Sequence, residues 1–215
     1  MKRTIHLLWV ALLMAVATGA SAQLKVGVKA GMNLASLSEL QIGDHAAGLD
    51  EKVGLHAGVL VQYVTPSRFG LETGLYYNML GGEERERDYD EDYKISATSH
   101  YLQLPVQLIY QFRLGDDLRL TPAAGLYGAY GLGGKVKASG SVRNTSIEIP
   151  STDFFNDATN RFDMGVTVGL NLEYERFLVG VGYEHGFLKL NKHPLVFEDD
   201  NSYNENIKVS IGILF

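Results

Sequence analysis

The chain has no cysteine and, after residue 22, no run of 18 apolar residues. Without cysteine it has no disulfide scaffold, thiolate metal site or thiol nucleophile. Without a long apolar run, the mature chain offers no helical membrane span. Basic residues are also in the minority: the 19 Lys and Arg less Lys2 and Arg3 leave 17, against 25 Asp and Glu, a net charge near −8. So acidic a chain is a poor binder of nucleic acid.

The first 22 residues predict a cleaved secretory signal peptide. A basic start precedes an apolar run from Leu7 to Ala17, and the small residues Ala20-Ser21-Ala22 end the segment. That order is typical of an export signal that is cut before Gln23. A membrane-anchoring helix is the alternative, but it needs about 20 apolar residues. Because the run breaks at Thr18, we expect residues 1–22 to be removed.

The stretch Tyr101 to Phe112, YLQLPVQLIYQF, has apolar residues at its even positions and mostly polar residues at its odd ones. A period of two predicts a β-strand with one apolar face. The other face carries Gln103, Gln107 and Gln111, which suit a narrow polar interior, so we expect the apolar face to contact lipid. Pro105, within this strand, predicts a bulge or a local opening of the ladder.

The same alternation recurs along the mature chain and predicts an all-β fold, an eight-stranded antiparallel transmembrane β-barrel over residues 23–215. The predicted strands cover about 24–34, 53–63, 69–79, 101–112, 118–132, 161–174, 177–187 and 206–215. The connections alternate between long and short, as the extracellular loops and periplasmic turns of outer-membrane barrels do. The predicted long extracellular loops are 35–51, 81–94, 133–160 and 189–205, and the predicted periplasmic turns are 65–68, 113–117 and 175–176.

Outward-facing aromatic residues are expected to mark the two membrane interfaces. Beside the short turns and the C-terminus this aromatic girdle comprises Tyr63, Phe69, Tyr110, Phe112, Tyr174, Phe177 and Phe215. The opposite girdle comprises Tyr77, Tyr130, Phe162 and Phe187. A soluble lipocalin-like barrel is the structural alternative, but its water-facing surface would here be rich in glycine and sparse in charge.

Charged residues on the polar faces predict a lumen charge cluster of Lys25, Lys29, Glu72, Arg119, Glu173, Glu184 and Lys208. Eight strands leave an interior that side chains fill, and a buried charge without a partner costs several kcal/mol. Counting residues from the periplasmic ends places Glu184 and Lys208 at similar heights on neighbouring strands. The same count places Arg119 and Glu173 near the lower ends of another pair. We therefore predict a paired lumen that does not conduct.

An acidic segment, 83–93, is the best candidate for a metal site. Asp88, Asp90 and Asp92 have the spacing of a calcium loop, but Tyr93 stands where that loop needs Gly, and Ser99 where it needs Glu. We therefore predict a solvated loop here, and another at Glu198-Asp199-Asp200.

The sequence indicates no catalytic residue, cofactor site or metal site. His56, on an inner face, and His185, on an outer face, lie on separate predicted strands and outside any recognisable catalytic motif. We therefore expect no enzymatic activity. An outer-membrane enzyme, or a small-ligand site at the barrel mouth, stays an alternative, because sites on barrels need no local motif.

Six segments, in this order, resemble the PorT-like outer-membrane β-barrel family, a branch of the small OmpA/OmpX-type barrels. They are KVGVKAGMN, YLQLPVQLIYQF, LTPAAGLYGAYGLGGK, RFDMGVTVGLNLEY, GVGYEHGF and KVSIGILF, and the resemblance covers Gln23 to Phe215. It implies a protein in outer-membrane lipid, whose terminal Phe215 is read by the barrel-assembly machinery. One founding member is implicated in protein secretion, and most members have no assigned activity.

Two non-enzymatic roles follow for this chain. The main expectation is a structural or interaction protein that acts through its extracellular loops. The alternative is an accessory of protein secretion or envelope assembly, with proteins of that apparatus as partners.

Overall fold

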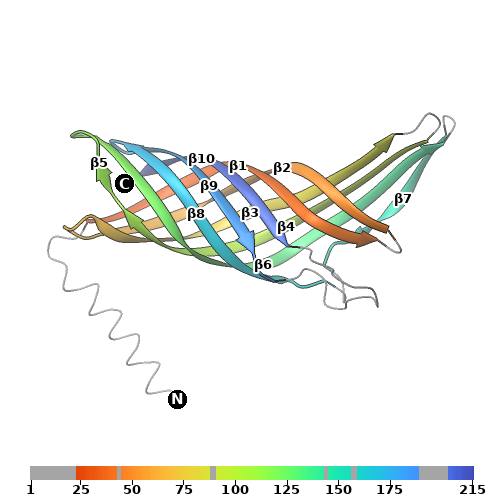
Figure 1. Ribbon diagram of the computed structural model, residues 1–215, viewed down its shortest axis with the longest axis horizontal. Coiled ribbons are helices and arrows are strands. Elements are labelled where there is room, and N and C mark those ends of the chain that lie inside the picture. The colour runs from red at the N-terminus through yellow and green to blue at the C-terminus, as the bar shows by residue number, and fades with distance from the viewer. Residues whose placement is uncertain (1–22, 43–44, 88–90, 143–144, 156–158, 189–202) are drawn as a thin grey trace, which may run out of the picture.

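The computed structural model describes residues 23–42, 45–87, 91–142, 145–155, 159–188 and 203–215 (Figure 1). The predicted signal peptide lies outside these residues, so its cleavage stays a prediction. Within them, no helix is long and apolar enough to cross a membrane. The strands of the described residues are β1 (Gln23–Ile42), β2 (His45–Val64), β3 (Phe69–Arg87), β4 (Glu91–Tyr110), β5 (Phe112–Arg113), β6 (Leu118–Val142), β7 (Thr145–Asp153), β8 (Phe162–Tyr174), β9 (Phe177–Gly186) and β10 (Asn204–Leu214).

The strands close into an antiparallel barrel in the order β4-β3-β2-β1-β10-β9-β8-β6, and β6 pairs back with β4. The two-residue β5 continues the line of β4 beyond Gln111 and pairs with β6, so β4 and β5 together count as one barrel strand. Strand β7 pairs with β6 alone among the described strands and stands outside the closed ring. The predicted eight-stranded antiparallel barrel is confirmed.

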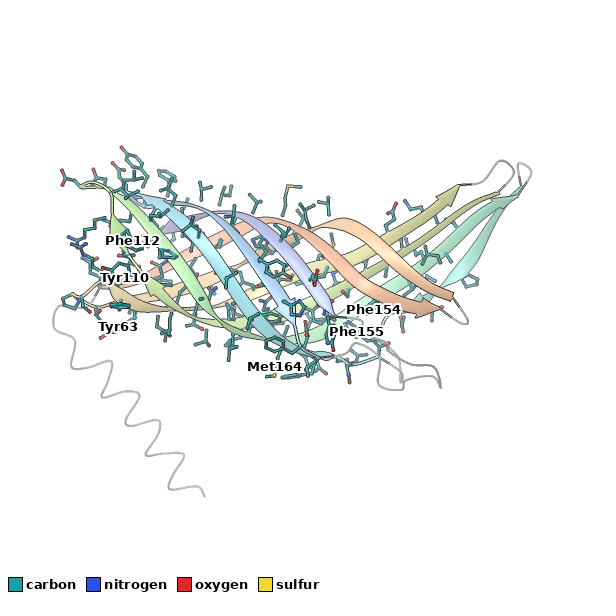
Figure 2. The ribbon with its side chains drawn as sticks, viewed as in Figure 1. Tyr63, Tyr110, Phe112, Phe154, Phe155 and Met164 are labelled. Carbon is teal, nitrogen blue, oxygen red and sulfur yellow. The ribbon has the colours of Figure 1, made fainter. Side chains whose placement is uncertain are left out.

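Alternation in the sequence reappears as alternation in exposure. In β8, Met164 and Val168 are exposed, while Asp163 and Thr167, which immediately precede them, are buried. The apolar side chains of the other barrel strands point outward in the same way (Figure 2). The apolar face is therefore the outside of the barrel, and the lipocalin-like alternative is wrong.

Three of the connections predicted as loops are built largely of paired strand. The ladders continue to Ile42↔His45 between β1 and β2, to Arg87↔Asp92 between β3 and β4, and to Val142↔Thr145 between β6 and β7. The segments 35–51, 81–94 and 133–160, predicted as loops, are therefore largely paired strand in their described parts. Polar side chains indicate contact with water, but they leave the backbone free to pair. Of the connection at 189–205, residues 189–202 lie outside the described residues.

The three short turns lie together at the opposite end of the barrel (Figure 1). The turn at 65–68 is closed by the Arg68 amide donating to Thr65 O at 2.9 Å. Both Arg68 (φ 70°) and Glu175 (φ 52°) adopt the left-handed conformation, which several types of tight turn use. The predicted turns are thus where the chain reverses.

Pro105 opens the ladder without a bulge. Pairs between β3 and β4 run as far as Thr73↔Val106 and resume at Tyr76↔Gln103 with no slip of register. Pro105 has no amide hydrogen to donate, and its carbonyl accepts instead from the Thr73 hydroxyl at 2.8 Å. Of the two predicted outcomes, the local opening is the correct one.

Strands differ in how far they extend at the end opposite the short turns. β3, β4 and β6 continue to Arg87, Glu91 and Val142, whereas β8 begins only at Phe162 and β9 ends at Gly186. We call the projecting residues 80–87 of β3, 91–99 of β4, 134–142 of β6 and all of β7 the outer wall. One side of the barrel mouth is therefore much taller than the other.

Candidate functional site

The lumen near the short turns is organised around Glu173, which is fully buried. Its carboxylate accepts from Lys25 Nζ at 3.3 Å, Thr121 Oγ1 at 3.1 Å, Gln62 Nε2 at 3.3 Å and Gln111 Nε2 at 3.4 Å. Both carboxylate oxygens therefore have donors from four different strands, and the charge is paired and fully hydrogen-bonded.

A second ion pair extends this layer. Lys29 Nζ lies 3.5 Å from Glu72 Oε1 and 3.4 Å from Asn171 Oδ1. Arg119 lies opposite Glu173 in the β6–β8 register, as the residue counting predicted. The ion partner of Glu173 is nevertheless Lys25, and Arg119 is half-exposed and pairs with no carboxylate of the described part of the chain.

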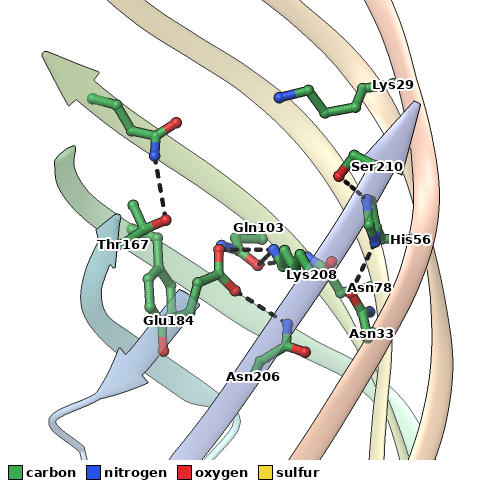
Figure 3. A network of polar contacts seen from close by, with 12 residues as sticks. Lys29, Asn33, His56, Asn78, Gln103, Thr167, Glu184, Asn206, Lys208 and Ser210 are labelled. Atoms are coloured by element: carbon green, nitrogen blue, oxygen red, sulfur yellow. Dashed lines mark hydrogen bonds and ion pairs between the residues drawn. The ribbon is translucent and has the colours of Figure 1, made fainter. Parts of the chain in front are cut away.

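The upper layer of the lumen joins Lys208 and Glu184, whose Nζ and Oε1 are 2.7 Å apart (Figure 3). The two residues meet as the residue counting predicted. Gln103 bridges them, since its Nε2 donates to Glu184 Oε1 at 2.7 Å and its Oε1 accepts from Lys208 Nζ at 3.3 Å. Asn206 Nδ2 completes the layer by donating to Glu184 Oε2 at 3.4 Å.

His56 lies inside the lumen, as predicted, in a relay that the sequence did not reveal (Figure 3). Asn33 Nδ2 donates to the Leu55 and Met79 carbonyls, which turns Asn33 Oδ1 toward His56 Nδ1 at 2.8 Å. Nδ1 therefore carries the proton, and Nε2 accepts from the Ser210 hydroxyl at 2.9 Å. The three residues are far apart in the sequence, so no motif could show them.

The connectivity of Ser210, His56 and Asn33 is that of a Ser-His-Asn triad. All three side chains are buried, however, and the cavity that His56 and Ser210 line holds only about 60 Å³. That is room for a few water molecules and too little for an acyl substrate. Within the lumen, the three side chains form a buried hydrogen-bond network.

An apolar plug closes the outer end of the lumen. Phe154 and Phe155, which follow β7, are buried at 4% and 5% exposure, and Phe155 packs edge-on against Tyr101 at 5.5 Å (Figure 2). A Cβ at Gly131 or Gly134 would overlap these two side chains, so glycine is needed there. The cluster consists of Ala35, Leu80, Ala97, Tyr101, Tyr127, Ala129, Phe154 and Phe155. The sequence analysis missed the plug, although an adjacent pair of phenylalanines in a polar segment was the available signal.

Asp163, beneath the plug, is a lumen charge that the predicted cluster omits. Its Oδ2 accepts from Tyr127 OH at 3.2 Å and Asn204 Nδ2 at 2.9 Å. No cationic side chain of the described residues lies within 4 Å of it, and its Oδ1 has no donor. Among the described residues, the lumen thus has three Lys–Glu pairs and one carboxylate held by neutral donors.

The predicted girdle residues lie on the outside of the barrel. Phe69, Phe112 and Phe215 are strongly exposed, and Phe69 and Phe112 each meet Tyr110 edge-on, at 4.7 and 4.6 Å (Figure 2). Tyr174 and Phe177 are also exposed, and Tyr63 and Tyr110 are half-buried. At the other interface Tyr77, Tyr130, Phe162 and Phe187 are exposed.

Outside the lumen, two predictions concerned the acidic segments and His185. Asp88 and Asp90 lie outside the described residues, as do residues 198–200. The described residues contain no group of three or more His, Asp or Glu placed to hold a metal ion. His185 faces outward, where its Nδ1 lies 3.2 Å from the Glu205 carboxylate.

Strand order, an apolar exterior and a polar interior together define a small transmembrane β-barrel. The chain belongs to the family described as outer membrane protein beta-barrel domain, whose model matches residues 17–191. The protein is therefore an outer-membrane β-barrel. A search of curated proteins found no match.

Several solved barrels are similar in structure. Ail, the attachment invasion locus protein of Yersinia pestis, is 13% identical with a TM-score of 0.40, over 89% of this chain and 98% of Ail. Neisserial surface protein A is 15% identical with a TM-score of 0.39, over 91% of this chain and 99% of its own. The outer membrane enzyme PagL is 14% identical with a TM-score of 0.42, over 88% and 98%. Likenesses at this level say nothing about the function of this chain.

The pairing of Lys208 with Glu184 predicts a measurable coupling. Glu184→Ala should lower the free energy of unfolding by about 3 kcal/mol, because it leaves a buried ammonium without its partner, and adding Lys208→Ala should recover part of that loss. Urea titration of the refolded barrel measures both. The exposed Lys94–Glu83 pair, also 2.7 Å apart, is the control, since Lys94→Ala should cost less than about 1 kcal/mol. Equal losses for the two pairs would contradict a dry, packed lumen.

Proposed function

We propose that this protein is a non-enzymatic outer-membrane barrel that acts as an interaction protein through its outer wall. The observation that carries the proposal is the continued pairing of β3, β4 and β6 well beyond the membrane-crossing part of the barrel. A membrane span needs only about 9 to 11 residues per strand, whereas β4 has 20 and β6 has 25. The extra strand length serves no purpose in crossing the membrane and presents an ordered surface outside it.

The filled lumen favours a role for the outer wall over a role in transport. Its two ion-pair layers and the plug of Phe154 and Phe155 leave a cavity of about 60 Å³ in the described part of the lumen. Large, stable single-channel currents in planar bilayers would contradict this closed lumen and favour a porin.

Strand β7 is the part of the wall best suited to a partner. Among the described strands it pairs with β6 only, so its other edge presents unpaired backbone groups. Such an edge can accept a strand from another protein. Pro150 lies in β7 where the β6–β7 register shifts between Val136 and Ala138, and such an irregularity is a position where a sheet accepts proline.

Site-specific crosslinking in intact cells tests the proposal. A photoreactive residue at Thr152, which is exposed in β7, should capture an envelope or extracellular protein that one at Asp116, exposed in a periplasmic turn, does not capture. Mass spectrometry would identify the captured protein. A secretion component would favour the role implied by the PorT-like resemblance. Identical products from the two positions would contradict an interaction through the wall.

If the protein were an enzyme, the relay of Ser210, His56 and Asn33 would be the candidate catalytic group. If it acts as a nucleophile centre, a fluorophosphonate probe should label the folded wild-type barrel and leave Ser210→Ala unlabelled. The burial of Ser210 predicts no labelling of either. Ser210-dependent labelling would overturn the non-enzymatic proposal.

A further inference from the structure

The outward face of the outer wall carries a cluster of lysines on neighbouring strands. Pairs of directly opposed residues share a face of a sheet. Gly81, Thr98 and Lys135 form one such row across β3, β4 and β6. The next row is Glu83, Ser96 and Lys137, two residues further from the membrane.

Lys135 and Lys137 have exposed side chains, and their ammonium groups make no hydrogen bond or ion pair with the described residues. Asp153 lies opposite Lys135 in the β6–β7 register without pairing with it. Lys94, one row higher, is held by Glu83 at 2.7 Å. Two cations on this face are thus available to a ligand.

Lys52, from β2, is fixed beside these rows. Its Nζ donates to Ser96 Oγ at 2.7 Å, Thr98 Oγ1 at 2.6 Å and Ala97 O at 3.2 Å. It reaches them across Gly81, where a Cβ would lie 3.1 Å from the Lys52 side chain. The absence of a side chain at Gly81 is what allows a third cation to lie against this face.

The charge of the cluster is incompletely balanced. Burial lowers the pKa of Lys52, Glu83 acts in the opposite direction, and Lys94 and Lys137 lower it further. The register places Asp50 opposite Glu83, Arg85 opposite Lys94, Glu148 opposite Ser139 and Asp153 opposite Lys135. The four lysines and Arg85 thus share these rows with four acidic residues, which leaves an excess of about one positive charge. The mature chain has a net charge near −8, so a group of lysines on one face contrasts with its overall acidic composition.

The register also sets the height of the cluster above the membrane. Strands with a rise of about 3.3 Å per residue, tilted about 40°, climb roughly 2.5 Å per residue, so an apolar band about 25 Å tall takes about 10 residues. Counted up β3 from the girdle residue Phe69, the band ends near Met79, whose row contains His100. The row of Lys135 is then about 5 Å above the band and that of Lys137 about 10 Å, within the headgroup layer.

We propose that Lys135 and Lys137, supported by Lys52 and Lys94, form a binding site for the phosphate of an anionic lipid headgroup in the outer leaflet. Lysine binds phosphate as a compact point charge, and the Ser96 and Thr98 hydroxyls lie on the same face. A headgroup bound at this site would hold the taller side of the barrel mouth close to the lipid of the outer leaflet. It does not depend on the interaction role proposed for β7.

Tryptophan fluorescence can test this site, because the only tryptophan, Trp9, lies in the predicted signal peptide. Residues 23–215 would be refolded into phosphatidylcholine nanodiscs that contain brominated phosphatidic acid, a phosphate monoester lipid. A reporter at Leu132→Trp, exposed just below the lysines, should be quenched more than one at Phe112→Trp, exposed at the opposite interface. Lys135→Gln with Lys137→Gln should weaken the preference for phosphatidic acid over phosphatidylcholine about 30-fold, at about tenfold per 1.4 kcal/mol and about 1 kcal/mol per lysine.

Two controls separate this site from general charge effects. Arg113→Gln with Arg176→Gln removes two exposed positive charges from the short-turn end and should leave quenching at Leu132→Trp unchanged. Inorganic phosphate added to the same nanodiscs should also leave it unchanged. If the arginine variant reduces quenching as much as the lysine variant, the proposal fails. Removal of the quenching by inorganic phosphate would show a soluble-anion site and overturn the assignment to lipid.

Discussion

Replacing Glu173 with alanine is expected to lower the free energy of unfolding by about 3–5 kcal/mol, the usual cost of breaking a buried ion pair by removing one partner. The substitution leaves the Lys25 ammonium without its counter-ion and takes the acceptor from Gln62, Gln111 and Thr121. Urea unfolding of the refolded barrel, followed by the heat-dependent shift in gel mobility, measures the loss.

Two further variants separate charge from hydrogen bonding at this position. Glu173→Gln keeps an acceptor oxygen but removes the charge, and should still destabilise the barrel because Lys25 stays unpaired. Glu173→Ala with Lys25→Met should recover part of the loss. Glu205→Ala, which removes a half-exposed carboxylate, should cost less than about 1 kcal/mol. A loss at Glu173 no larger than that at Glu205 would show that water enters the lower lumen.

Arginine at Val168 is expected to cost about 2–4 kcal/mol, because this position lies at the middle of β8 and faces lipid. The same substitution at Phe162, at the outer end of the strand, should cost about 0–1 kcal/mol, since the penalty falls toward the interface. Folding yield and unfolding free energy in bilayers measure both. Val168→Leu, which keeps the site apolar, is the control for the loss of valine itself. Equal costs at Val168 and Phe162 would contradict the placement of the membrane along β8.

The lumen and the outer wall of this barrel are expected to have different roles. Inside, Glu173 and Glu184 are paired with lysines, and Asp163 is held by neutral donors. Outside, β7 pairs with β6 alone among the described strands, and Lys135 and Lys137 have no ion partner among the described residues. Any recognition by this protein is therefore expected on the wall.

The amino-acid sequence by itself determined the barrel. Alternation with a period of two is a local property, because successive side chains of a strand point to opposite faces. Eight strands, their inner and outer faces and the three short turns could therefore be found without knowledge of any contact. Two particular placements followed as well, Glu184 beside Lys208 and Arg119 opposite Glu173, because each pair lies on neighbouring barrel strands at similar heights above the short-turn end.

Tertiary structure alone decided the rest, because it depends on which segments meet across the barrel. Lys25 reaches Glu173, 148 residues away, since strand stagger brings β1 and β8 to one height on opposite sides of a narrow lumen. Asn33, His56 and Ser210 form one relay because β1 pairs with both β2 and β10. Polar segments of the outer wall form strands because each pairs with a neighbouring backbone. Phe154 and Phe155 are buried only because the closed barrel places Tyr101, Tyr127 and the other residues of the plug around them. Contacts between residues so far apart in the chain produce no periodic pattern in the sequence.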